Sequence, residues 1–289
     1  MNTNYFTYLL IFAMLLWGGG WSALKVLTQT QPMDTIVFWR FFLMSLSFLP
    51  ILYFLKIPIH ITKRNFRYII MSSILNIAFM IFSYLGIKNG LAGAGSVIIT
   101  TLSPIITIIL TIIFFKKRLI YLQAFGIFFG LLGGFIMLEL NDISLFLSSD
   151  NIYFLIAAVI WAGITILAQY SHLHIHPIHY SFAISVVATI VSFIYVFNSN
   201  FLSVLDEGYL FWFSLLYLAI FGQTIATTIF FMASGKLGSQ KTSSFMFLVP
   251  FFALFIAWIV LDEEMQLHII IGGILSVIAV FFINKKGDI

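Results

Sequence analysis

Long apolar segments separated by short polar connections run through the whole sequence. Each segment is close to the roughly 20 residues that a helix needs to cross a lipid bilayer. A membrane β-barrel would show alternating apolar and polar positions, and these continuous segments do not. We therefore predict an all-α integral membrane protein with ten transmembrane helices. Their ranges are 5–27, 34–55, 68–88, 91–115, 121–139, 151–170, 177–197, 209–232, 240–261 and 267–284.

The composition agrees with a chain whose surroundings are lipid. Hydrophobic residues make up 62% of the 289 residues and charged residues only 8%, whereas soluble domains carry about 25% charged residues. Cysteine is absent, which excludes disulfides and thiolate metal sites. A sequence pI of about 9.2 would suit a nucleic-acid-binding protein. The placement of the charges along the chain excludes that class.

Charged residues are sorted between alternate connections. If the N-terminus faces the cytoplasm, 11 of the 14 Lys and Arg lie on cytoplasmic segments, at positions 56, 63, 64, 67, 116–118, 236, 241, 285 and 286. The acidic residues lie outside, at positions 34, 139, 142, 150, 206, 207 and 262–264, with Asp288 as the exception. Membrane proteins concentrate positive charge on the cytoplasmic side. The sorting therefore predicts that both termini are cytoplasmic.

The second half of the sequence repeats the first. At offsets of 144 to 146 residues, Trp17 aligns with Trp161, Ser96 with Thr242, Pro104 with Pro250 and Gly126 with Gly272. Five spans per copy insert the second copy upside down, and basic 116–118 accordingly align with acidic 262–264. Inverted repeats are typical of secondary transporters, which alternate between two pseudo-symmetric states around a central site. We predict two inverted five-helix repeats, 1–140 and 151–285.

The residues that carry this pattern resemble a known family. The stretch from Trp17 to Lys25, followed by Pro32 and Arg40-Phe41, resembles the start of a repeat of the EamA family, in the drug/metabolite transporter superfamily. The blocks 92–138 and 238–283 both resemble the end of such a repeat. The resemblance implies a carrier of the plasma membrane (the inner membrane of a bacterium), often an exporter of amino acids or related metabolites. Lys117 and Ser185 depart from the family pattern.

Polar side chains within the spans are the candidates for a substrate site, because a polar group that faces lipid is costly. Trp17 and Trp161 either form a cavity wall or only pack, and Asn76 and Gln223 either bind a solute or cross-link helices. The fourth span aligns its hydroxyls on one face, which either lines a cavity or lets helices approach closely. The substrate-binding candidates are Trp17, Asn76, Ser83, Tyr84, Ser96, Thr100, Ser103, Trp161, Thr165, Gln223 and Thr227.

Cations, prolines and histidines complete the set of candidates. Lys25, Arg40 and Lys88 would form an electropositive outer vestibule for a carboxylate, although Arg40 has the alternatives of snorkelling or pairing with Asp34. Pro104 and Pro250 would act as hinges, because each removes one helix hydrogen bond. The cluster of His172, His174, His176 and His179 either contacts lipid headgroups or binds a metal such as zinc. We assign no cofactor and no resident metal.

Together these features predict a transporter and not an enzyme. Motifs such as G-x-S-x-G and H-E-x-x-H are missing from the sequence. We expect a secondary transporter that exports amino acids or related small metabolites by alternating access, with a proton or another ion as a coupling partner. A multidrug or quaternary-cation exporter and a lipid flippase are the alternatives. No carboxylate lies deep in a predicted span, which speaks against the cation exporter.

Overall fold

The structure, a computed structural model, describes residues 3–56, 63–89, 92–138, 151–261 and 267–285. Helices form all of the regular structure within these ranges. The α-helices are α1 Thr3–Thr30, α2 Met33–Leu55, α3 Lys63–Asn89, α4 Ala92–Phe115, α5 Tyr121–Met137, α7 Ile152–Ser171, α8 Pro177–Val196, α9 Tyr209–Leu216, α10 Thr228–Leu237, α11 Ser239–Ser244, α12 Val249–Leu261 and α13 Leu267–Asn284. Two 3₁₀-helices, η1 Phe201–Asp206 and η3 Phe245–Leu248, and one π-helix, η2 Tyr217–Thr227, complete the set.

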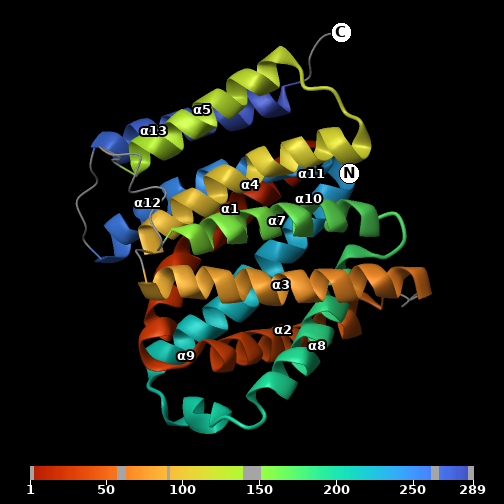
Figure 1. The fold of residues 1–289 in the computed structure, drawn as a ribbon, viewed down its shortest axis with the longest axis vertical. Helices are drawn as coiled ribbons and strands as arrows, with labels where there is room; N and C mark the ends of the chain where they lie inside the picture. The colour runs from red at the N-terminus through yellow and green to blue at the C-terminus, as the bar shows by residue number, and fades with distance from the viewer. Residues whose placement is uncertain (1–2, 57–62, 90–91, 139–150, 262–266, 286–289) are drawn as a thin grey trace.

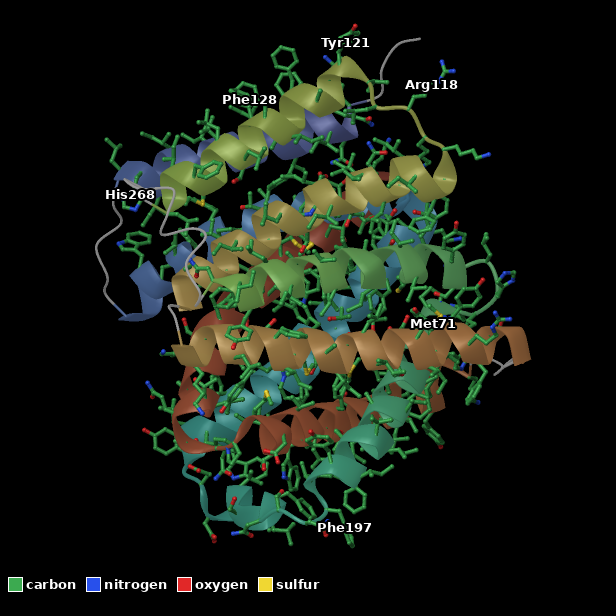
Figure 2. The ribbon with its side chains drawn as sticks, in the orientation of Figure 1. Met71, Arg118, Tyr121, Phe128, Phe197 and His268 are labelled. Atoms are coloured by element: carbon green, nitrogen blue, oxygen red, sulfur yellow. The ribbon has the colours of Figure 1, made fainter. Side chains whose placement is uncertain are left out.

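The predicted all-helical membrane architecture is confirmed. Nine helical stretches in the described part of the chain are long and apolar enough to cross a membrane, and α5 is a shorter apolar helix of 17 residues. Together α9, η2 and α10 make the eighth span, and α11, η3 and α12 make the ninth. Large apolar side chains such as Tyr121 and Phe128 project from the outside of the bundle (Figure 2). Such a surface suits lipid rather than water.

The helices pack in pairs that correspond between the two halves of the chain. Along the longest axis, α5 lies against α13 at one end and α2 lies against α8 toward the other (Figure 1). Between them α7 contacts α3 and α4, while α1 contacts η2 and α12. The two sets of contacts are equivalent in the repeat: α7 and α1 are the first spans of their halves, and each contacts the third and fourth spans of the other half. The N-terminal end of α1 and the C-terminal end of α13 face the same side of the bundle.

Glycines bring α5 and α13 into backbone contact. A Cβ atom at Gly133 would lie 2.9 Å from the Gly272 carbonyl oxygen, and one at Gly126 would lie 2.8 Å from the Ala279 carbonyl oxygen. Small residues at helix interfaces are the usual way for transmembrane helices to approach this closely. This pair therefore depends on the absence of side chains at its contact points.

The eighth and ninth spans depart from regular α-helix. In the π-helix η2, the hydroxyls of Thr224 and Thr227 each donate to the carbonyl five residues back, at 3.1 Å. The 3₁₀-helix η3 ends just before Val249 and Pro250, and a proline has no N–H to donate. Pro104, in contrast, lies inside the continuous helix α4. Both irregular segments thus belong to the second half of the chain.

The basic connection between α4 and α5 lies at the end of the bundle where α1 begins. The Lys117 ammonium lies beside Gly238, and the backbone N–H of Ser239 donates to the Gln169 side chain at 2.7 Å. Arg118 lies at this end, opposite His268 (Figure 2).

Some of the charges on which the predicted orientation depends lie outside the described residues, namely Glu139, Asp142, Asp150, Asp262, Glu263, Glu264, Lys286 and Asp288.

Histidines of the connection between α7 and α8 belong to the same end. The His172 ring packs on Gly235. Burial, the nearby Lys236 and the nearby His176 lower the pKa of His172. Burial and Lys236 likewise lower the pKa of His176. Protonation of these rings therefore opposes the packing of the connection against α10.

Substituting Gly133 by alanine should destabilise the protein by roughly 1–3 kcal/mol, because the methyl group meets a backbone oxygen of α13. The matched control is Gly163→Ala in α7, where a Cβ would contact only Leu75 Cδ1, at 3.6 Å. That substitution should be neutral or slightly stabilising, because alanine favours helix over glycine. Thermal unfolding in detergent measures both variants. Equal effects would contradict the backbone contact.

Acidification should destabilise the end of the bundle that carries His172. Because the pKa of His172 lies below its usual value, the unfolded chain binds more protons than the folded one between that lowered pKa and about pH 6.5. The contribution to stability is complete above about pH 6.5 and is lost as the pH falls through this window.

Removing the charge of Lys236 tests this pH dependence. Lys236→Gln should raise the pKa of His172, because it removes one cause of the lowering, and should reduce the loss of stability. Lys241→Gln removes the same charge from α11 and serves as the control. Thermal unfolding between about pH 5 and pH 7.5 gives the comparison. The same pH profile for both variants would count against an effect of Lys236 on His172.

Candidate functional site: a cavity in the middle of the bundle

A cavity of about 110 Å³ lies among seven of the spans. A water molecule needs about 10–15 Å³ on this scale, so the cavity accommodates several waters or a small solute. Trp17, Asn76 and Trp161 lie near the midpoints of α1, α3 and α7, which puts the cavity near the middle of the bilayer. The lining consists of Leu16, Trp17, Gly20, Trp21, Leu24, Arg40, Asn76, Phe79, Met80, Ser83, Ile99, Thr100, Trp161, Leu218, Gly222, Gln223, Thr227, Met246 and Val249.

One side of the cavity is aromatic. The rings of Trp17 and Trp161 meet edge to face with centroids 5.2 Å apart, and the Phe79 ring lies 4.7 Å from that of Trp161. Phe230 packs on both tryptophans, at 5.1 and 5.8 Å. The Trp17 Nε1–H donates to the Gly222 carbonyl in η2 at 2.9 Å, which joins the aromatic side to the π-helix. An apolar or aromatic part of a solute would fit this side.

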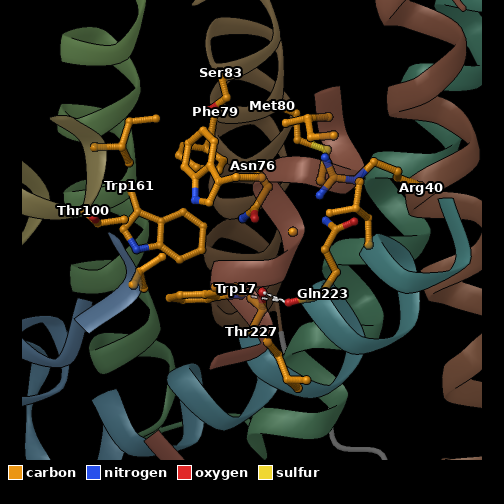
Figure 3. A pocket seen from close by; sticks show the side chains of 18 of the residues that line it. Trp17, Arg40, Asn76, Phe79, Met80, Ser83, Thr100, Trp161, Gln223 and Thr227 are labelled. Carbon is orange, nitrogen blue, oxygen red and sulfur yellow. Dashed lines mark hydrogen bonds between the residues drawn. The ribbon is translucent and has the colours of Figure 1, made fainter. Parts of the chain in front are cut away.

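The other side of the cavity is polar. Figure 3 shows the side chains of Arg40, Asn76 and Gln223 converging from α2, α3 and η2. Arg40 Nε, Gln223 Oε1 and Ser83 Oγ are buried without a hydrogen-bond partner, as is Trp161 Nε1 at the aromatic side. Buried polar atoms in proteins are normally paired. Unpartnered atoms around a cavity therefore indicate a space that water or a polar solute fills.

A hydrogen-bond network joins α1, α3 and η1 at the end of the bundle opposite the start of α1. The Gln31 side chain donates to Glu207 Oε1 at 2.7 Å and accepts from the Ser203 hydroxyl at 2.9 Å. The Tyr84 hydroxyl donates to the Gln31 carbonyl at 2.8 Å. These bonds tie the end of α1, which contributes lining residues through its middle, to α3 and η1.

The structure brings most of the predicted substrate-binding residues to one place. Seven of them line the cavity: Trp17, Asn76, Ser83, Thr100, Trp161, Gln223 and Thr227. Tyr84, Ser96, Ser103 and Thr165 lie outside the lining. Ser103 donates to the Ala158 carbonyl at 3.1 Å and Thr165 to the Trp161 carbonyl at 2.8 Å. Of the hydroxyl face of α4, Ser103 therefore contacts α7 and Thr100 lines the cavity, whereas the polar side of the cavity comes mainly from α2, α3 and η2.

The three cations predicted for an outer vestibule have different positions. Arg40 lines the cavity, Lys25 donates to the Ile87 carbonyl at 3.5 Å, and Lys88 is exposed. The Arg40 guanidinium makes no hydrogen bond or ion pair with the other described residues. Asp34, the expected alternative partner, accepts from the backbone N–H of Thr35 at 3.0 Å. Arg40 thus belongs to the cavity and not to a surface ion pair.

The predicted hinges lie away from the cavity, as does the histidine cluster for which headgroup contact and metal binding were the alternatives. Pro104 and Pro250 are buried in α4 and α12 but do not line it. The rings of His176 and His179 lie edge to face, 5.9 Å apart. Within the residues that the structure describes, no group of three or more His, Asp or Glu side chains comes close enough to hold a metal ion.

Some lining residues escaped the sequence-based prediction. Gly20 and Trp21 follow Trp17 by three and four positions and therefore share its helix face. That spacing was a sufficient signal for both. Leu218 and Gly222 reach the cavity from the π-helix, where α-helical spacing no longer tells which residues share a face.

Comparison with known proteins assigns the family. The EamA-like transporter family matches residues 6–139 and again residues 149–285. The uncharacterized transporter YoaV of Bacillus subtilis is 24% identical over 94% of both chains. The uncharacterized transporter YyaM of the same organism is 25% identical over 84% of this chain and 81% of its own. A WAT1-related chloroplastic protein of Arabidopsis thaliana is 25% identical over 69% of this chain and half of its own.

Solved structures agree on the fold. A crystal structure described only as that of a protein superimposes with a TM-score of 0.74 at 12% identity and covers 98% of both chains. The family matches, taken together, extend over almost the whole sequence. The chain therefore belongs to the EamA-like transporter family and is a multi-pass membrane transporter.

Proposed function

We propose that the chain is a secondary carrier that exports amino acids or related small metabolites by alternating access through the central cavity. The observation that carries this proposal is the group of unpartnered polar atoms around a cavity in the middle of the bundle. Carriers of this kind bind their solute near the bilayer midplane, where helices are interrupted. Here η2 and η3 are the interrupted helices, and both contribute lining residues.

Two inverted repeats, close to 1–140 and 151–285, support the alternating mechanism. The family matches the chain twice, over residues 6–139 and 149–285. The packing has the symmetry that such repeats produce, because α7 packs on α3 and α4 in the same way that α1 packs on η2 and α12. The charges of the connections favour cytoplasmic termini in the plasma membrane, which is the bacterial inner membrane if the source is a bacterium.

The lining of the cavity favours a solute with both polar and apolar parts. Aromatic rings form one side, and Arg40, Asn76 and Gln223 form the other. A quaternary cation fits this lining less well, because Arg40 is positive and none of the described lining residues is acidic. An amino acid or a related metabolite presents the matching combination of groups.

Removal of Trp17 should strongly reduce export without preventing insertion into the membrane. Trp17→Ala deletes an aromatic contact and the hydrogen bond to Gly222, and we expect accumulation outside the cell to fall by about tenfold or more. Trp258→Ala is the matched control, because Trp258 is exposed on α12 and does not line the cavity.

Mass spectrometry of the spent medium measures the effect. Cells that express the unchanged protein, Trp17→Ala or Trp258→Ala are compared at equal levels of protein in the membrane. One or a few amino acids or relatives should accumulate with the unchanged protein and with Trp258→Ala only. Equal accumulation in all three media would refute the role of Trp17, and the lack of any accumulated amino acid or relative would refute metabolite export and leave lipid flipping or uptake to be examined.

A further inference from the structure

We propose that Arg40 binds the carboxylate of the solute, and that the cavity therefore selects small carboxylates whose apolar part lies against Trp17 and Trp161. The inference rests on the proposed transport through this cavity and adds the chemical class that is carried. It assigns the positive charge inside the bundle to substrate recognition.

The position of Arg40 is the first argument. It follows Met33, the first residue of α2, by seven residues or about two helical turns. Its side chain turns into the cavity beside Met80 and does not follow α2 back toward the helix end (Figure 3). Arginine stays charged under all ordinary conditions. A charge at this depth is costly unless it is paired or hydrated.

The missing counter-ion is the second argument. Arg40 makes no ion pair or hydrogen bond with the rest of the described chain, and its Nε is buried. The lining contains no acidic residue among the positions that the structure describes. The planar guanidinium matches a carboxylate with two parallel hydrogen bonds. A solute carboxylate would supply the negative charge that Arg40 lacks among the described residues.

Further polar atoms define what else the solute presents. Ser83 Oγ and Trp161 Nε1 are unpartnered and able to donate, and Gln223 Oε1 is an unpartnered acceptor. The acceptor suits an ammonium or hydroxyl group of the solute. An amide oxygen carries no full charge, so it contributes less than the guanidinium. The carboxylate is therefore the required group and the ammonium an accessory one.

The arrangement of the two sides sets the orientation of the solute. In Figure 3, Trp161 lies across from Arg40 with Asn76 between them, and Trp17 lies between Trp161 and the η2 segment that carries Gln223. A molecule with a carboxylate at one end and an apolar body at the other satisfies both sides at once. A volume of about 110 Å³ restricts it to a small molecule.

A set of matched compounds tests the class. The purified full-length protein in detergent is titrated with L-phenylalanine, with 3-phenylpropanoate, which lacks the amine, and with phenethylamine, which lacks the carboxylate. L-leucine, 4-methylpentanoate and isopentylamine form a second set with a smaller body. Binding raises the unfolding temperature by mass action. At least one amino acid and its deaminated acid should bind, and neither amine should.

Substitution of Arg40 tests the residue. Arg40→Gln should weaken carboxylate binding by about 10- to 100-fold, because a charge-assisted hydrogen bond is lost. Arg40→Lys keeps the positive charge but not the two parallel hydrogen bonds, so its affinity for carboxylates should lie between those of the unchanged protein and Arg40→Gln. Lys88→Gln removes an equal charge from an exposed position and should bind like the unchanged protein. The unfolding temperature of each variant without compound reports whether it folds.

The outcomes separate this inference from the proposed function. Carboxylate binding that Arg40→Gln leaves unchanged would overturn the role of Arg40 and leave export standing. Binding of the amines in preference to the acids would overturn the carboxylate class and favour a cation exporter. If no compound binds, the inference is overturned for solutes of this size, while amino-acid accumulation in the medium would still uphold export.

Discussion

A polar atom inside a bilayer has to find its partner within the protein, because lipid chains offer none. Most hydroxyls of this bundle meet that demand by donating to a carbonyl about one turn back in their own helix; examples are Ser45, Thr100, Thr111, Thr165 and Ser192. Others link helices, as Ser72 does with Tyr180. Several buried polar atoms have no hydrogen-bond partner among the described residues; those of Arg40, Ser83, Trp161 and Gln223 share one cavity, whereas others, such as those of Ser181 and Gln240, lie away from it. Their need for partners supports the proposal that this cavity binds a solute.

The sequence was a good guide to everything that depends on hydrophobicity and on exact spacing between the repeats. The ten spans follow from apolar length, and the repeat aligns Trp17 with Trp161, whose rings are in contact in the structure. Asn76 and Gln223 were placed inside because lipid excludes them. In each case the cause is the hydrophobicity of a segment, the cost of a polar side chain in lipid or the spacing of the repeat, and all three can be read directly from the order of residues.

The remaining features depend on which helix lies opposite, and the sequence does not contain that information in a readable form. The spacing in α4 predicts a hydroxyl face, but its members meet different neighbours. Ser103 donates to an α7 carbonyl, Thr111 bonds with Ser239 of α11, and Thr100 lines the cavity. The sequence predicts that Arg40 lies about two turns inside α2, but it does not determine whether the side chain points toward Asp34 or into a cavity. The π-helix η2 shifts the residues that share a face, which α-helical periodicity does not anticipate.

The two halves of the chain differ in helix regularity, and this difference concerns segments that line the cavity. In the first half α3 and α4 are continuous α-helices, whereas the corresponding spans of the second half contain η2 and η3. Trp17 donates to the Gly222 carbonyl, and Tyr217 donates to the Leu16 carbonyl at 2.9 Å, so that α1 is bonded to η2 on both sides of the contact. A rearrangement of η2 must break these bonds or carry α1 with it. Because Trp17 and Gln223 both line the cavity, either event changes its shape, and a solute that contacts both would favour one arrangement over the other.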